Sequence, residues 1–214
     1  MNDEIQFHTA PMSRGRMVHW MLEEIGAPYR PHLYDLFAGE HKRPEFLAIN
    51  PLGKVPAIVH RDAVITEVAA IITYLADAFP AAKLAPPIGD SQRGPYLRWI
   101  FFAAATLEPA IIDHVTKRQP PTERPLALSY GSVQAVTDTL QQALCRSPYL
   151  LGERFSAADL YVGAQIGFGV GSECLEPLPE FQAYLTRVTD RPANKRFEAQ
   201  AAQWVADMEA RKRT

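Results

Sequence analysis

The chain has 214 residues, 47% of them hydrophobic, which is enough apolar material for a substantial core in one domain or two. Its formal net charge is −2, so it lacks the basic excess with which proteins bind nucleic acids or anionic membranes. No apolar run reaches membrane-spanning length and the first residues are acidic and polar, so we expect a cytoplasmic protein whose partners are small molecules or other proteins.

The first eighty residues alternate between strand and helix patterns. From Ser13, apolar residues recur at helical spacing, and Gly26 stands where a helix end favours a left-handed residue. Prolines mark the next strand as an edge or irregular strand. The expected elements are strands at Ile5–His8 and Tyr29–Tyr34, helices at Ser13–Gly26 and Pro44–Ile49, two further strands within Val55–Ile65, and a helix ending at Phe79.

The stretch from Asn50 to Ala70 organises this half and reads NPLGKVPAIVHRDAVITEVAA. A turn leads into two short apolar runs joined by a charged two-residue turn, and strands so close together must pair as a hairpin. Pro56 has no N–H to give to a sheet. A cis Val55–Pro56 bond would turn the backbone N–H and C=O of Val55 outward, as a strand edge for a peptide-like ligand.

The residues after the hairpin predict an ion-binding helix start. Thr66 can cap a helix whose free N–H groups hold a carboxylate, and Glu67 beside them can hold an ammonium. A strand edge, an anion site and a fixed carboxylate in one segment suit a small zwitterionic peptide.

The run NPLGKVPA followed by TExAAI resembles the glutathione-binding half of the cytosolic glutathione S-transferases, and the resemblance extends over nearly the whole chain. It implies an α/β plus all-α fold: a thioredoxin-like domain at 1–80, a linker at 81–90 and an all-helical domain at 91–214. It also implies a homodimer with glutathione as co-substrate and no other cofactor. The two cysteines, Cys145 and Cys174, lack metal-type spacing, so we expect reduced, buried or half-buried thiols and no metal site.

Helical signals dominate the second half. An apolar helix around Trp99 to Leu107 is expected to line the centre, and prolines at 120, 121 and 125 precede a helix at Leu126–Cys145. Ser156 and Asp159 form a capping box whose role in the family is structural, so Asp159 is given no catalytic role. The last expected helices are Pro179–Thr189 and Pro192–Met208.

The resemblance implies a set of glutathione contacts. The backbone of Val55, next to Pro56, should pair with the cysteinyl part, and Glu67 should meet the γ-glutamyl ammonium. Val68 stands where the family usually has Ser, which removes a side-chain bond to the γ-glutamyl carboxylate but keeps the backbone N–H, so weaker affinity is expected. Two lysines are candidates for binding the glycyl carboxylate, Lys42 and Lys54. For Lys42, a solvated loop lysine without such a role is an equal alternative.

Glutathione chemistry requires a thiolate, and a free thiol of pKa about 8.5 is only slightly ionised at neutral pH. The family activates the thiol from the turn into the first helix, and here no Tyr or Cys occurs between Ile5 and Met17, as in bacterial types that use another donor. Ser13 is the first candidate, Arg14 the second and Thr9 the third. Alternatively Ser13 merely caps the helix, and Arg14 and Arg16 are solvated surface charges.

The second substrate should meet an apolar wall formed by the first turn and the long helix. Its candidates are Met12, Trp99 and Phe102, with Phe101 and His114 also considered, although aromatic residues at helical spacing more often form core. We expect a glutathione transferase acting on hydrophobic electrophiles. A glutathione-dependent disulfide or peroxide reductase and a noncatalytic binding module remain the alternatives.

Overall fold

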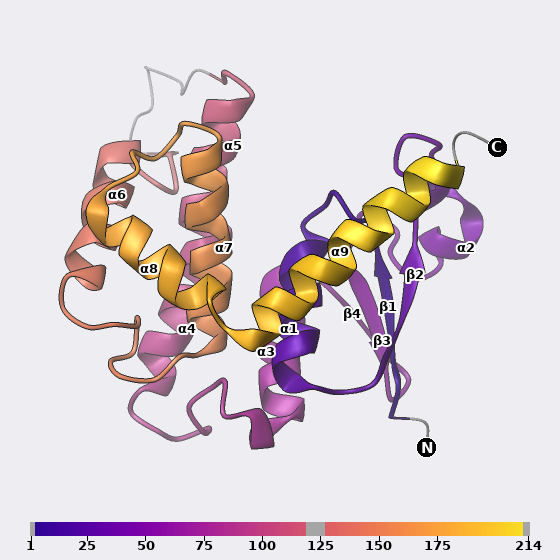
Figure 1. Ribbon diagram of the computed structural model, residues 1–214, viewed down its shortest axis with the longest axis horizontal. Coiled ribbons are helices and arrows are strands. Elements are labelled where there is room, and N and C mark those ends of the chain that lie inside the picture. Colours follow the sequence, from indigo (N-terminus) through magenta and orange to yellow (C-terminus); the bar gives the residue numbers. More distant parts are fainter. Residues whose placement is uncertain (1–2, 119–126, 212–214) are drawn as a thin grey trace. The chain divides into compact units, whose positions relative to one another are not determined.

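The computed structural model describes residues 3–118 and 127–211 (Figure 1). The chain divides into two compact units, Met1–Ala82 with Arg191–Thr214, and Lys83–Asp190. The prolines at 120, 121 and 125 and the expected helix start at Leu126 lie outside the described residues.

The first unit is built on a four-stranded sheet in the order β2-β1-β3-β4. Strands β1 and β2 are parallel, whereas β1 with β3 and β3 with β4 are antiparallel. The expected hairpin is therefore confirmed, with Ala57 paired to Thr66 at one end. The strands are β1 (Ile5–Thr9), β2 (Tyr29–Leu33), β3 (Ala57–His60) and β4 (Ala63–Thr66).

Helices complete this thioredoxin-like unit. Gly26 has a φ of 65° and ends the first helix, as its sequence position predicted. Helix α1 packs against both α3 and α9. The bounds are α1 (Gly15–Ile25), η1 (Glu40–Lys42), α2 (Pro44–Leu47), α3 (Val68–Ala78), η2 (Pro80–Ala82) and α9 (Pro192–Arg211).

Three local expectations were wrong. Helix α2 ends at Leu47 rather than at Ile49, and strand β3 begins only after Pro56. Thr66 is the last residue of β4 and does not cap α3, because Glu67 occupies the N-cap position without a side-chain capping bond. Thr66 is held in an extended conformation by its pairing with Ala57 in the sheet. The chain therefore turns into α3 at Glu67.

The second unit is helical, as predicted. Its elements are α4 (Arg93–Phe102), the π-helical turn η3 (Ala103–Leu107), α5 (Glu108–Val115), α6 (Val133–Leu144), α7 (Ala157–Gly171) and α8 (Pro179–Thr189). Helix α4, η3 and α5 form the expected long helix, with a wider turn just before Pro109. Proline lacks an N–H and crowds the carbonyl four residues earlier, and the π turn accommodates this defect.

The capping box is confirmed at the start of α7. Asp159 is fully buried and accepts hydrogen bonds at 2.8 to 2.9 Å from the N–H of Leu150, the N–H and hydroxyl of Ser156 and the hydroxyl of Tyr184. Burial raises the pKa of the Asp159 carboxyl, and these donors oppose the rise. Its partners are structural, in agreement with the sequence.

Helix α9 belongs to the first unit, whereas the sequence placed 91–214 in a single helical domain. Trp204 on α9 stacks on His19 of α1 with ring centroids 4.2 Å apart, and Arg191 binds Glu24 through two contacts of 2.7 Å. These contacts join residues that are far apart in sequence, so no local pattern reveals them. As domain limits, 1–80, 81–90 and 91–214 stay a prediction.

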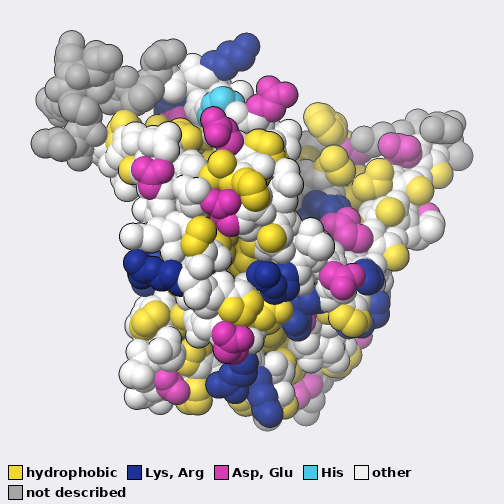
Figure 2. Space-filling model, turned by 60° about the vertical axis from the view of Figure 1, so that its left-hand side comes forward, with side chains coloured by type: hydrophobic (Ala, Val, Ile, Leu, Met, Phe, Trp, Pro, Cys, Tyr) yellow, Lys and Arg dark blue, Asp and Glu magenta, His cyan; other side chains and the backbone are white. Residues whose placement is uncertain are grey.

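The surface charges, the apolar length of the helices and the exposure of the two cysteines can each be compared with the expectations from the sequence. Figure 2 shows acidic and basic side chains interspersed on the face that it draws. No helix among the described residues is long and apolar enough to cross a membrane. Cys174 is buried, which raises the pKa of its thiol, but Cys145 is exposed, contrary to expectation.

Candidate functional site

Asn50 shapes the turn before β3. This buried residue donates from its side-chain amide to the carbonyl of Lys54 at 2.7 Å and accepts from the N–H of Leu52 at 3.2 Å. The Val55–Pro56 peptide bond that follows is cis, and Pro56 is buried. Within residues 3–118 and 127–211 the backbone N–H and C=O of Val55 have no hydrogen-bond partner. An extended peptide backbone can therefore pair with Val55.

Glu67 is held in an unusual backbone conformation. Its φ of 66° and ψ of 122° are rarely adopted by a residue with a side chain, and such strain gathers at ligand-binding positions. The Glu67 side chain is exposed, and the backbone N–H of Val68 lies in the first turn of α3. Glu67 thus immediately precedes the free N–H groups at the start of α3, and ion binding by these groups stays a prediction.

The sheet brings the sequence-predicted segments to one end. Ala57 pairs with Thr66 on β4 and with His8 on β1. The residues just beyond these pairs are Pro56, Glu67 and Thr9, so the cis-proline turn, the start of α3 and the end of β1 are neighbours. The register of the strands alone therefore brings together residues 9, 56 and 67, which are far apart in the sequence.

Ser13 lies in the turn between β1 and α1 and is half-buried. Its hydroxyl donates to the carbonyl of Ala10 at 2.7 Å and accepts from the N–H of Gly15 at 3.0 Å. The hydroxyl therefore fastens the turn in this structure, but it is not the helix cap that the sequence kept open, because Arg14 occupies the N-cap position of α1. The Ser13 hydroxyl can donate to the sulfur of a ligand only if its proton turns away from the carbonyl of Ala10.

The other polar residues of this turn differ in their surroundings. Thr9 is buried and packs against the start of α1, where its hydroxyl would clash with any Cβ added at Gly15. Arg14 is half-buried at the N-cap position of α1. Arg16 forms an ion pair with Glu198 through Nη2, and both side chains stay partly exposed, so Arg16 is a surface charge with a defined partner.

Of the two predicted lysines, Lys42 contacts the turn at 50–54 and Lys54 is the last residue of that turn. The ammonium of Lys42 donates to the carbonyl of Leu52 at 2.8 Å and packs over Gly53, while Lys54 is exposed. The sequence reasoning missed His41, whose Nδ1 is buried and lacks a hydrogen-bond partner among the described residues. The basic pair His41 and Lys42 in the polar loop is the signal that could have identified it.

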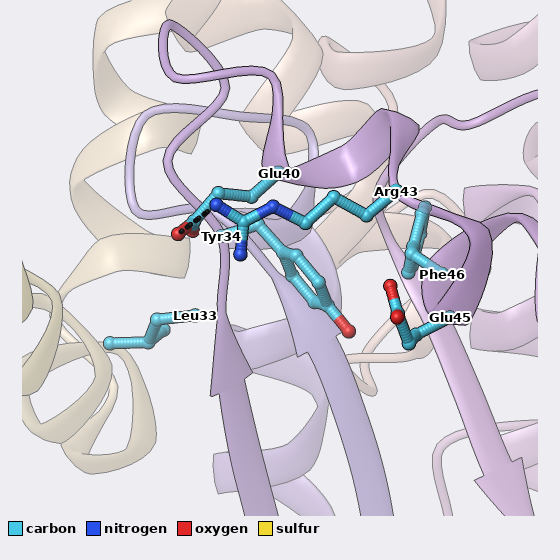
Figure 3. Close-up of a pocket in the computed structure, with 6 residues that line it drawn as sticks. All are labelled: Leu33, Tyr34, Glu40, Arg43, Glu45 and Phe46. Atoms are coloured by element: carbon cyan, nitrogen blue, oxygen red, sulfur yellow. Dashed lines mark ion pairs between the residues drawn. The ribbon is translucent and has the colours of Figure 1, made fainter.

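A surface hollow of about 260 Å³ lies beside the end of β2 (Figure 3). An ion pair of 3.7 Å joins Arg43 to Glu40 at its rim, and the Tyr34 hydroxyl lies 2.9 Å from Nδ1 of His8. None of the predicted site residues lines this hollow. Its lining residues are Leu33, Tyr34, Glu40, Arg43, Glu45 and Phe46.

The residues of the expected apolar wall belong to both units. Met12 is 78% exposed in the first unit. In the second, Trp99 is buried under the guanidinium of Arg98, which lies 3.7 Å from the ring centroid, and Phe102 contacts Trp99 edge-on. Phe101 and His114 are exposed. Arg98 therefore covers the face of the Trp99 ring, and Arg98 rather than this ring face is exposed to solvent. The pocket for the second substrate stays a prediction.

No group of three or more His, Cys, Asp or Glu side chains within the described part of the chain is placed to hold a metal ion. The site instead offers a strand edge, a helix start, a carboxylate and basic side chains. These groups suit a zwitterionic peptide with two carboxylates and one ammonium.

Residues 12–78 match the model of the glutathione S-transferase N-terminal domain. Glutathione S-transferase 1 of Dianthus caryophyllus is 32% identical over 68% of this chain and 70% of its own length. The disulfide-bond oxidoreductase YfcG of Escherichia coli K12 is 30% identical over 88% of this chain and 92% of its own. A glutathione transferase family member from Pseudomonas fluorescens, solved with two glutathione molecules bound, has a TM-score of 0.74 and is 26% identical, covering 91% of this chain and 92% of that one. The chain therefore belongs to the cytosolic glutathione S-transferase family.

Proposed function

We propose that the protein binds glutathione at this end of the sheet, stabilises its thiolate and transfers it to a hydrophobic electrophile. The observation that carries the proposal is the convergence of the unpaired Val55 backbone and the strained Glu67 beside the turn of Ser13. Membership of the transferase family supports the same reading.

Each part of the tripeptide has a proposed partner. The cysteinyl backbone pairs with Val55, the γ-glutamyl ammonium meets Glu67, and the γ-glutamyl carboxylate meets the N–H of Val68. The glycyl carboxylate is assigned to the basic groups around the turn at 50–54, which are His41, Lys42 and Lys54. Val68 offers no hydroxyl, so the affinity should be modest.

The chemical step requires the thiol proton to leave to solvent and the sulfur to attack the electrophilic carbon, with the leaving group departing with its bonding electrons. Each unit by which the thiol pKa falls corresponds to about 1.4 kcal/mol of preference for the anion. Ser13 is our first donor to the sulfur. When its proton turns from Ala10 to the sulfur, its oxygen still accepts from the N–H of Gly15. Arg14 is the second donor.

Disulfide reduction is a second candidate function, and the resemblance to the Escherichia coli oxidoreductase over 88% of the chain favours it. The two reactions share the thiolate and differ in the second substrate. A homodimer in the cytoplasm is also proposed, on the ground of membership of the glutathione S-transferase family.

Calorimetric titration with glutathione tests the binding step. Glu67→Ala should weaken binding at least about tenfold by removing the ammonium partner, whereas Glu153→Ala, which removes an exposed carboxylate in the other unit, should not. An unchanged dissociation constant for Glu67→Ala contradicts the proposed contact, and no binding to the unmodified chain contradicts the function.

Turnover tests the chemical step. We expect conjugation of a chloronitrobenzene by the unmodified protein, and Ser13→Ala should lower kcat about tenfold or more while sparing glutathione affinity. Reduction of hydroxyethyl disulfide without conjugation would select the second candidate. Unaltered kcat in Ser13→Ala would move the donor role to Arg14 or the backbone.

A further inference from the structure

Arg16, in the first turn of α1, is held by α9. Its guanidinium reaches both carboxylate oxygens of Glu198 at 2.6 and 2.7 Å and lies 4.8 Å from the centroid of the Phe197 ring. Both contacts come from the single nitrogen Nη2 of Arg16, and the Phe197 ring lies beside the same guanidinium. The side chain of Arg16 is therefore anchored to α9 by a charge-assisted contact and a ring contact.

Arg16 is in turn bonded to the residue proposed to activate the thiol. Its backbone N–H donates to the carbonyl of Ser13 at 3.2 Å, and the Ser13 hydroxyl donates to Ala10. A continuous set of contacts thus runs from Glu198 through Arg16 to the turn of Ser13.

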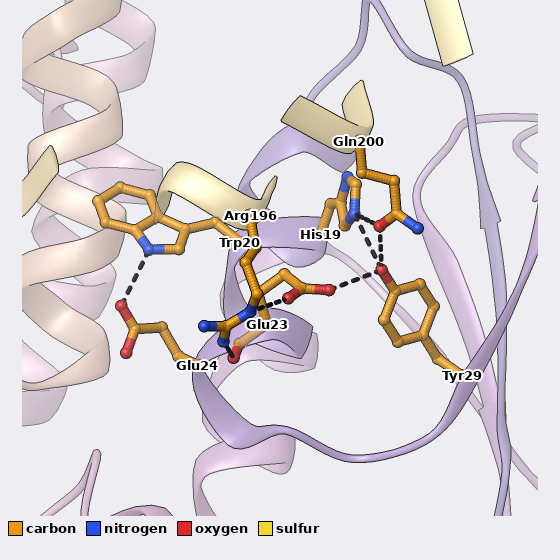
Figure 4. Close-up of polar contacts among 7 residues, drawn as sticks. All are labelled: His19, Trp20, Glu23, Glu24, Tyr29, Arg196 and Gln200. Carbon is orange, nitrogen blue, oxygen red and sulfur yellow. Dashed lines mark hydrogen bonds and ion pairs between the residues drawn. The ribbon is translucent and has the colours of Figure 1, made fainter. Parts of the chain in front are cut away.

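Other residues of α9 close over the same turn. Ala201 and Trp204 line a small void together with Ala10, Gly15 and neighbouring residues at the start of α1. Figure 4 shows two further contacts along the helix pair, from Arg196 to Glu23 at 2.8 Å and from His19 to Gln200 at 2.7 Å. Residues of α9 therefore contact α1 and the turn before it at several points, and Glu198 forms the ion pair with Arg16.

We propose that Glu198 is a positioning residue for the transfer reaction, which holds the first turn of α1 through Arg16 so that the Ser13 hydroxyl meets the glutathione sulfur. The inference rests on the proposed function of Ser13. It assigns α9, which follows the helical unit in sequence, a part in the glutathione half of the protein.

The pair has little to do with overall stability. The side chains of Arg16 and Glu198 are 36% and 52% exposed, and ion pairs so exposed contribute little to folding because water screens them. Removing Glu198 should leave the fold intact, so a change in chemistry can be separated from unfolding.

The test compares Glu198→Ala with the unmodified protein. We expect kcat for conjugation to fall about fivefold and the KM for glutathione to stay within about twofold, because Val55 and Glu67 lie on other elements. The bound thiol should ionise at higher pH, by about half a unit, when its thiolate is followed by ultraviolet absorbance. Gln203→Ala, on the exposed side of α9, is the matched control and should alter none of these quantities.

A double reversal, Arg16→Glu with Glu198→Arg, restores the ion pair and should recover most of the lost kcat. Unchanged thiol ionisation in Glu198→Ala, or ionisation at lower pH because the freed guanidinium acts on the sulfur itself, overturns the positioning role. If Ser13→Ala shows normal thiol ionisation, the proposed function of Ser13 fails instead, so the two failures are distinguishable.

Discussion

The imidazole of His8 stacks on that of His32, with ring centroids 4.5 Å apart and planes within 11° of parallel. The two residues are direct partners in the register of β1 and β2. Nδ1 of His8 lies 2.9 Å from the Tyr34 hydroxyl, and His8 is 6% exposed. Burial, with a smaller effect of the neighbouring His32 charge, lowers the pKa of His8 to about 4.

This lowered pKa predicts acid sensitivity. The unfolded chain protonates His8 near its ordinary value of 6.5, and the folded chain does so only near 4, so the stability is fully present above pH 6.5 and is lost as the pH falls toward 4. We expect the free energy of unfolding to drop by about 1 to 3 kcal/mol over this range from His8 alone.

Urea unfolding at several pH values checks the prediction. His8→Asn should flatten the fall between pH 6.5 and 4, even if it lowers stability at neutral pH, and the exposed His114→Gln should keep the original profile. Parallel profiles for His8→Asn and the unmodified protein would assign the acid sensitivity to other groups.

Gly15 is required by close packing at the start of α1. A Cβ at this position would lie 1.9 Å from the Thr9 hydroxyl and 3.0 Å from that of Ser13. Thr9 is buried and cannot move aside freely, so Gly15→Ala should cost about 2 to 3 kcal/mol of unfolding free energy and lower kcat with it. Combining it with Thr9→Ala removes the nearer oxygen and should recover part of the stability, whereas purely additive losses would show that the two residues do not interact.

Asp159 should matter for stability and not for chemistry. Asp159→Ala leaves the N–H groups of Leu150 and Ser156 without their acceptor and leaves the hydroxyl of Tyr184 only the backbone carbonyl of residue 159 at 3.3 Å, and we expect a loss of about 3 to 4 kcal/mol in chemical denaturation. Activity per folded molecule should be unchanged at a temperature where the variant is folded. A specific loss of kcat would contradict the structural role.

The sequence could predict features that depend on neighbouring residues. The hairpin follows from two apolar runs with a charged turn between them, and the Ser156 cap follows from a four-residue pattern. Pro56 marked a break in the strand edge because proline cannot donate to a sheet. Such signals lie within a few residues, where spacing fixes geometry.

Contacts between distant residues could not be predicted in this way. Glu198 lies 182 residues from Arg16, and nothing in either local pattern joins them, so the sequence did not indicate their ion pair. The bond from the Ser13 hydroxyl to the carbonyl of Ala10 depends on the path of the turn, so the sequence could not predict it, and the role of Ser13 as a donor to sulfur stays a prediction. The cap was assigned to Thr66 because its type suits capping, although the β ladder extends to that residue.

The strained backbone of Glu67 gives the sharpest separation of binding from stability. At a φ of 66° and a ψ of 122°, a residue with a Cβ costs about 1 to 3 kcal/mol, whereas glycine adopts positive φ freely. The free energy of unfolding of Glu67→Gly should therefore be at least about 1 kcal/mol higher than that of Glu67→Ala. Both variants should bind glutathione at least about tenfold more weakly than the unmodified protein.

Asp62 supplies the control, because it has a similar φ of 67° in the exposed turn between β3 and β4. Asp62→Gly should change stability without changing the dissociation constant of glutathione. If Glu67→Gly bound glutathione as the unmodified protein does, the side chain would have no part in recognition. If Glu67→Gly were no more stable than Glu67→Ala, the backbone conformation at residue 67 would carry no energetic cost. The positive φ of Glu67 would then no longer indicate a residue that is kept in place for ligand binding.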